Sequence, residues 1–120
     1  MRSWIYDMIV GKLVEELSLT VLAGQDQLQR NVAAAYCSDM LSRVMAKGIK
    51  DSLWITVQTH LNIIAVATLH EMSCIIIPED IAVDEKTLAK AEEEQVIVLA
   101  SSMSAYTIAG KLFALGVPSI

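Results

Sequence analysis

The second half of the chain alternates short apolar runs with segments of helical length, and no other feature constrains the fold as strongly. The runs cover residues 53–57, 74–77 and 96–100. The last two are apolar throughout, which is typical of parallel strands that are covered on both faces. Parallel strands need long crossover connections, usually helices, and these crossovers are right-handed. We therefore predict an α/β fold of three layers, with a mostly parallel sheet built from consecutive strand–helix units.

Polar residues in front of periodic apolar segments predict where helices begin. Helices are expected at residues 8–17, 39–46, 60–72 and 85–94, with the caps Asp7, Ser38, Thr59 and Asp84. A final helix should start at Ser102 or Ser104 and end at Leu115. Gly48 and Gly116 should end the second and the final helix in the left-handed conformation. Two further strands are expected at 19–23 and 32–37, separated by a polar turn at 24–27.

The length of 120 residues predicts one domain over residues 1–120, with 1–7 as an extra N-terminal segment. Its expected radius of gyration is roughly 14 Å. Hydrophobic residues make up 54% of the chain, above the usual share of about 45–50%. Two explanations stay open: a second copy covers part of this apolar surface, or the alanines inflate the count.

Charge and motif content exclude several classes of protein. The net charge is −5, and the 9 basic residues are scattered, so a nucleic-acid partner is not expected. The longest apolar stretch, 61–72, is interrupted by polar residues and too short to cross a bilayer, and no signal peptide is visible, so we expect a cytoplasmic protein without membrane contact. Phosphate-binding loops and the common hydrolase and metalloprotease motifs are absent from the sequence.

Cysteines and histidines give no metal or cofactor site. Cys37 and Cys74 lie too far apart for a CxxC motif, and each is expected to be a buried, reduced thiol. His60 and His70 are ten residues apart, so they cannot share a metal on one helix face. No cofactor is predicted.

Polar residues follow each predicted parallel strand, at the sheet edge where ligands bind in open α/β sheets. Hydroxyls and free N–H groups at helix starts can hold a carboxylate or a phosphate there. The alternative is that these side chains only cap their helices. The candidate ligand residues are Ser38, Asp39, Gln58, Thr59, His60, Ser101, Ser102 and Ser104.

The predicted helix around residues 61–69 is apolar around most of its circumference, which is typical of a helix that is covered on more than one side. We predict that it forms a homodimer interface; a wholly internal helix is the alternative. Trp4 and Tyr6 either join the same contact or belong to a misassigned start ahead of Met8. The expected interface residues are Leu61, Ile64, Ala65, Thr68 and Leu69.

Several stretches match one family: 22–24 leading into 28–32, then 36–42, 53–62 and 104–110, the last two in both spacing and identity. On these stretches the chain resembles a DRTGG domain over nearly its whole length. Arg30 of the name-giving motif is retained, but Gln29 stands in place of the acid and alanines 33–35 in place of Thr-Gly-Gly. Arg30 and Asn62, which lie in the matching stretches, join the candidate ligand residues.

DRTGG domains are similar to the N-terminal domains of HPr kinase/phosphorylase and of Mur ligases. They also occur among CBS domains in regulated pyrophosphatases and beside phosphotransacetylase domains. The resemblance therefore implies a regulatory or dimer-forming module without chemistry of its own.

The sequence thus predicts a stand-alone, non-enzymatic regulatory domain that forms a homodimer and binds a small anionic metabolite or nucleotide at the strand ends. One alternative is a small enzyme or phosphotransfer-related protein that uses His60 with Ser38, Asp39 or Ser102. Another is a scaffold that docks onto a signalling or metabolic enzyme, such as a kinase, a phosphatase or a redox enzyme.

Overall fold

In the part of the chain that the structure describes, five strands form one sheet in the order β1-β5-β4-β3-β2. The computed structural model describes residues 8–120. Strands β2 to β5 run parallel to one another, and β1 pairs antiparallel with β5. The strands are β1 Thr20–Ala23, β2 Ala34–Cys37, β3 Ser52–Ile55, β4 Cys74–Ile77 and β5 Val98–Ala100. The predicted α/β fold with a mostly parallel sheet is confirmed.

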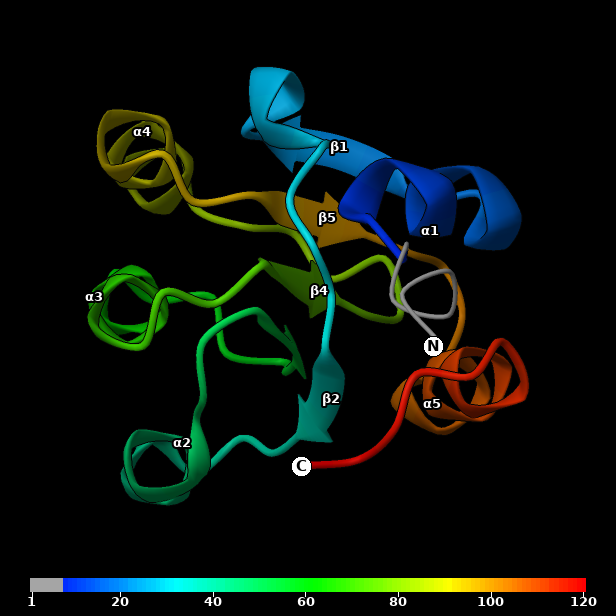
Figure 1. Cartoon of the computed structure of the whole chain (residues 1–120). Helices are drawn as coiled ribbons and strands as arrows, with labels where there is room; N and C mark the ends of the chain where they lie inside the picture. Colours follow the sequence, from blue (N-terminus) through cyan, green and yellow to red (C-terminus); the bar gives the residue numbers. More distant parts are fainter. Residues whose placement is uncertain (1–7) are drawn as a thin grey trace.

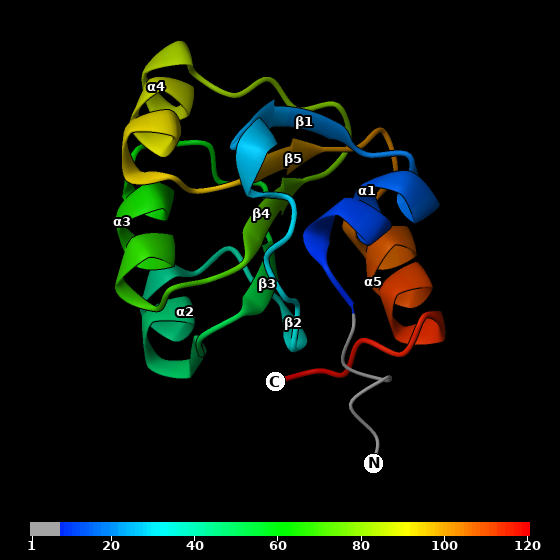
Figure 2. The same cartoon turned by 45° about the horizontal axis from the view of Figure 1, so that its top comes forward.

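Helices cover both faces of the sheet and so complete the three layers (Figure 1). One face carries α1 (Val10–Leu17) and α5 (Ala105–Ala114). The other carries α2 (Leu41–Lys47), α3 (Asn62–Leu69) and α4 (Glu85–Glu94), with α3 between its two neighbours (Figure 2). A short 3-10 turn, η2 (Gln25–Gln27), follows β1. No helix within residues 8–120 is long and apolar enough to cross a membrane.

Two hydrophobic clusters lie on opposite faces of the sheet, because successive strand residues point to opposite sides. Leu53 and Ile55 of β3 pack toward α1 and α5. Trp54 between them packs toward α3, in the cluster that also holds Ile75 and Ile77. Each central strand contributes side chains to both clusters, which explains why residues 74–77 are apolar without interruption. The radius of gyration, 12.9 Å, is slightly below the expected value.

Residues 118–120 lie along the outer edge of β2. The Ala35 N–H donates to the Pro118 carbonyl at 2.8 Å, and the Ile120 N–H donates to the Ala35 carbonyl at 3.1 Å. Ala35 and Ser119 form a parallel bridge. This segment therefore covers part of the sheet edge that β2 would otherwise leave open.

Several predicted helix starts are wrong. Helix α1 starts at Val10 and not at residue 8, because Ile9 is extended and bridges Asn31; the expected cap Asp7 lies outside the described residues. Helix α2 starts at Leu41 without a cap from Ser38, whose hydroxyl accepts instead from the Met40 N–H at 3.3 Å. Helix α3 starts at Asn62 and takes no cap from Thr59.

The α4 and α5 boundaries are closer to prediction. Asp84 occupies the residue before α4, although its side chain makes no capping hydrogen bond. Ser104, and not Ser102, caps α5, because its hydroxyl accepts from the Thr107 N–H at 3.2 Å. Gly116 follows α5 with a φ of 97°, as predicted, whereas Gly48 has a φ of −58° and does not adopt the left-handed conformation.

Candidate functional site

The loop after β2 and the loop after β3 are joined by hydrogen bonds that centre on Asp39. One carboxylate oxygen of Asp39 accepts from the Thr56 hydroxyl and from the Val57 N–H, both at 2.8 Å. The Gln58 side chain donates to the Asp39 carbonyl at 3.0 Å. Trp54 adds a bond from its indole N–H to the Ser38 carbonyl at 2.8 Å. The structure thus brings Ser38, Asp39 and Gln58 together, and it uses the Asp39 carboxylate to hold the two loops to each other.

The start of α3 uses His60 in place of the expected cap. The Nδ1 atom of His60 accepts from the Asn62 N–H at 3.2 Å. Thr59 contributes its carbonyl, which accepts from the buried Thr87 hydroxyl of α4 at 2.7 Å. Within residues 8–120, no hydrogen bond joins His60 to Ser38, Asp39 or Ser102. The His60 side chain therefore satisfies a backbone N–H where the loop after β3 leads into α3.

The loops after β4 and β5 are joined along their backbones. The Glu79 N–H donates to the Met103 carbonyl and the Asp80 N–H to the Ser101 carbonyl, both at 2.9 Å. Ser101 is itself buried, and its hydroxyl accepts from the Met103 N–H at 3.0 Å. Glu79 and Asp80 have φ values of 62° and 55°, a conformation that costs a non-glycine residue about 1–3 kcal/mol. These backbone bonds offset that cost and fix the conformation of the loops after β4 and β5.

A hollow of about 270 Å³ opens beside the loop after β5. Lys111 of α5 lines it together with Ser18 and Ser102, and the acidic residue Glu16 lines it as well. Lys111 and the two serines can donate hydrogen bonds to a small anionic group, while Glu16 brings one opposing negative charge to the same hollow. Lys111 and Ser18 are not among the ligand residues predicted from the sequence. The available signal for Lys111 was its spacing, since it lies seven residues after Ser104 and therefore on the same helix face.

Arg30 lies at the opposite ends of the parallel strands, where β2 and β4 begin. Its guanidinium donates to the Glu71 carbonyl at 3.1 Å, in the turn that precedes β4. Together with Lys50 and Gln95 it lines a separate hollow of about 280 Å³. The alanines of the altered motif do not form a ligand loop, because Ala34 and Ala35 begin strand β2. The structure therefore separates Arg30 from the other candidate ligand residues.

Helix α3 buries most of its apolar side chains inside its own chain. Ile64 is fully buried, so it cannot touch a second copy directly. Leu69 remains 62% exposed and Leu61 39% exposed; Ala65 and Thr68 are also at the surface. Next to this strip, the Lys90 ammonium of α4 pairs with the Glu94 carboxylate at 3.2 Å. The predicted dimer surface thus reduces to four residues beside charged groups.

The two cysteines differ in exposure, which corrects the prediction that both are buried. Cys74 is fully buried, and this burial raises the pKa of its thiol to about 12. Cys37 is exposed, although partial burial of its sulfur, and after it the Asp39 carboxylate, raise the pKa of its thiol. Both thiols therefore stay protonated at neutral pH and are weak nucleophiles. Across residues 8–120, no three His, Cys, Asp or Glu side chains gather in a group that could hold a metal ion.

The family model described as DRTGG domain matches residues 12–115. The chain belongs to the DRTGG domain family. Among solved structures, it is similar to the CBS and DRTGG domains of the regulatory region of Clostridium perfringens pyrophosphatase, crystallised with the activator diadenosine tetraphosphate. The TM-score is 0.72 at 12% identity over 91% of this chain. The match covers 47% of that chain, so this DRTGG domain spans about half of its length. No curated protein matches the sequence.

Proposed function

We propose that this DRTGG domain is a regulatory module that senses a small anionic ligand, a nucleotide or a related metabolite, and catalyses no reaction itself. It forms a homodimer and transmits ligand binding to a partner enzyme. The observation that carries the proposal is the match of nearly the whole chain to a domain family that occurs in a regulatory region. The ligand class follows from that region's complex with diadenosine tetraphosphate.

The side chains at the sheet edge favour binding over catalysis. The Asp39 carboxylate is engaged by Thr56 and Val57, and the Nδ1 atom of His60 by Asn62. A general base needs to reach both its proton donor and the substrate. The groups that the enzymatic alternative requires are instead used to fix loops.

The hollow beside Ser102 is the favoured position for the anionic group. Lys111 supplies the positive charge, and the hydroxyls of Ser18 and Ser102 supply donors. The backbone bonds between the loops after β4 and β5 keep one wall of the hollow in place before a ligand arrives. A preorganised wall reduces the entropy lost on binding.

A thermal-shift panel tests this proposal with diadenosine tetraphosphate, mononucleotides and inorganic phosphate. A ligand at 100 times its Kd should stabilise the wild type by about 2.7 kcal/mol, which corresponds to roughly 10 °C for a domain of this size. Lys111→Met should abolish the shift, whereas Lys86→Met, an exposed lysine at the start of α4, should keep it.

Absence of any shift across the panel would contradict the ligand proposal. A shift that Lys111→Met leaves intact would place the ligand elsewhere on the domain. Sedimentation of the wild type between about 1 and 100 μM tests the homodimer separately, because it needs no ligand.

A further inference from the structure

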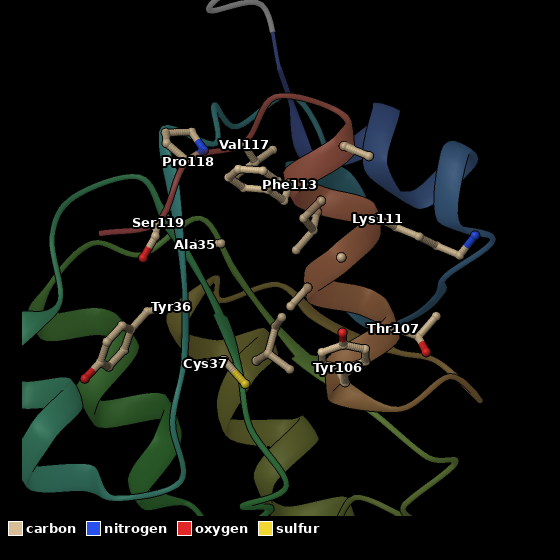
Figure 3. Close-up of a pocket in the computed structure, with 15 residues that line it drawn as sticks. Ala35, Tyr36, Cys37, Tyr106, Thr107, Lys111, Phe113, Val117, Pro118 and Ser119 are labelled. Carbon is tan, nitrogen blue, oxygen red and sulfur yellow. The ribbon is translucent and has the colours of Figure 1, made fainter.

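A groove of about 740 Å³ runs between helix α5 and the edge strand β2. Tyr106, Ala109, Gly110 and Phe113 form one wall, and Figure 3 shows Ala35, Cys37, Pro118 and Ser119 on the other. Among the residues of 8–120 that line it, Lys111 is the one that carries a charge, and Figure 3 shows its side chain pointing away to the other side of α5. The groove is therefore apolar and almost without charge.

Two aromatic side chains stand in the open along this wall. Tyr106 is 89% exposed and Phe113 is 76% exposed. Seven residues separate them, which is close to two helical turns, so both rings lie on one face of α5 about 10 Å apart along its axis. Aromatic side chains in this setting mark a surface that a partner covers.

Gly110 lies between the two rings, and its side-chain position faces open space among residues 8–120. A Cβ atom added there would meet nothing within 4 Å. Glycine weakens the interior of a helix relative to alanine. No contact within residues 8–120 demands a glycine here, and its missing side chain leaves room for the close approach of a group from outside.

The stripe is self-complementary under a twofold axis. The midpoint between residues 106 and 113 falls between the two small residues Ala109 and Gly110. If two α5 helices pack antiparallel about that point, Tyr106 of each copy faces Phe113 of the other. The small residues then sit where the two helix axes come closest, and the same patch serves both copies, as an isologous interface requires.

We propose that two copies of this domain associate through the α5 stripe of Tyr106, Ala109, Gly110 and Phe113, with the groove beside β2 completing the interface. This inference rests on the homodimer proposed above and names its face. Charge supports a second copy as the occupant. The chain has a net charge of −5, so two copies repel over most of their surface, but this face carries no acidic group among the groove residues.

The area also fits a pair of copies. Aromatic side chains bury about 150–250 Å² each, so the four rings of a pair, which are 76% to 89% exposed in one copy, would bury roughly 500 to 800 Å². A specific interface buries about 1,200–2,000 Å² in total. The remaining contribution comes from the apolar residues of the groove wall and from residues 118–120.

Sedimentation equilibrium of the full chain and three variants tests this face. The wild type should be a dimer. Phe113→Glu should raise the dimer dissociation constant at least about 30-fold, the effect of losing an aromatic anchor that packs against the partner's Tyr106. Leu69→Glu is the matched control, because it places the same charge on the exposed strip of α3, and it should leave the dissociation constant unchanged within about threefold.

The third variant separates a role at an interface from a role in the fold. Gly110→Gln should raise the unfolding temperature of the monomer, because glutamine favours helix more than glycine, and should weaken the dimer at least about tenfold. Circular dichroism checks that every variant keeps its fold.

The outcomes separate the α5 interface from the proposed homodimer on which it rests. A wild type that stays monomeric up to about 100 μM overturns both the homodimer and this face. A wild-type dimer that persists in Phe113→Glu but dissociates in Leu69→Glu overturns this face and keeps the homodimer through α3. A monomeric wild type that captures an amphipathic helix in the groove would also overturn the second copy as the occupant.

Discussion

Helices α3 and α5 are both rich in apolar residues, yet they use them in opposite ways. Helix α3 lies between α2 and α4 and packs against the sheet, so Ile63, Ile64 and Val66 are buried (Figure 1). Helix α5 has α1 on one side and the edge strand β2 on the other (Figure 2). It buries Ile108 and Leu112 but leaves Tyr106 and Phe113 in the open. The position of a helix within its layer, more than its own hydrophobicity, therefore decides how much apolar surface it presents.

The same difference explains the high hydrophobic content of the chain. Many of the hydrophobic residues lie in a sheet whose central strands are covered on both faces. Leu53, Trp54 and Ile55 of β3, for example, are all buried. A smaller part is left on α5 and the groove beside it. Experiments that compare a buried residue with an exposed one, in reactivity or in the stability lost on mutation, test this difference.

Thiol labelling should give the largest contrast between a covered and an open position. In the folded Phe113→Glu variant, which leaves the groove uncovered, a maleimide should modify Cys37 at least about a thousandfold faster than Cys74, because a buried thiol whose pKa is raised to about 12 is both inaccessible and protonated. Mass spectrometry of digested samples measures both rates. Equal rates would mean that the sheet around β4 opens readily.

Cys74 also predicts a loss of stability in alkali. Its thiol pKa is higher in the folded state than the ordinary value of 9.0, so folding favours the protonated form. The associated stability is complete below about pH 9 and is lost as the pH rises toward 12. Cys74→Ala should remove this part of the pH dependence, while its smaller side chain lowers stability at neutral pH.

A pair of truncations in α3 should give the next largest effect. Ile64→Ala should lower the free energy of unfolding by about 2–5 kcal/mol, because it leaves a cavity in a fully buried site. Leu69→Ala, on the exposed strip of the same helix, should change it by less than about 1 kcal/mol. Urea unfolding at one protein concentration measures both. A large effect at Leu69 with none at Ile64 would reverse the assignment of the covered face.

Two glycines should respond to alanine with opposite signs and the smallest effects. Gly110→Ala should stabilise the monomer by about 0.5–1 kcal/mol, since nothing lies within 4 Å of the new methyl group. Gly48→Ala should destabilise by about 1–3 kcal/mol, because the methyl group would lie 2.7 Å from the His70 ring. Both are measured in the Phe113→Glu background, so that association does not contribute. Equal signs would show that the two sites do not differ in packing.

Much of the fold follows from the sequence because local signals agree with the tertiary structure. Strand β4 was predicted at 74–77, where it lies, since an unbroken apolar run between polar residues has few other interpretations. The bounds of α4 at 85–94 were also predicted, because a charged helix on the surface follows its own periodicity. Ser104 and Gly116 were correct as the ends of α5.

The predictions that fail concern residues whose polar groups bond to a part of the chain that is distant in the sequence. Thr56 and Val57 were predicted to lie in a strand that leads directly to a helix, but both bind Asp39 from the neighbouring loop. Such bonds shorten the strand and delay the start of α3, and no local pattern reveals them. Arg30 was grouped with the strand-end residues, and only the path of the chain places it at the opposite ends of the strands. Lys111 was missed because its place beside Ser18 also depends on that path.

The hydrogen bonds between residues 118–120 and β2 have a consequence for how this domain can assemble. A strand edge that accepts another strand presents a new edge in turn, so that growth by this route has no natural limit. Here the edge is already partly occupied from within the chain, and a neighbour would first have to displace it. Contact through a helix face about a twofold axis consumes the same patch on both copies and ends at two. Residues 118–120 thereby favour a closed pair over an open-ended filament.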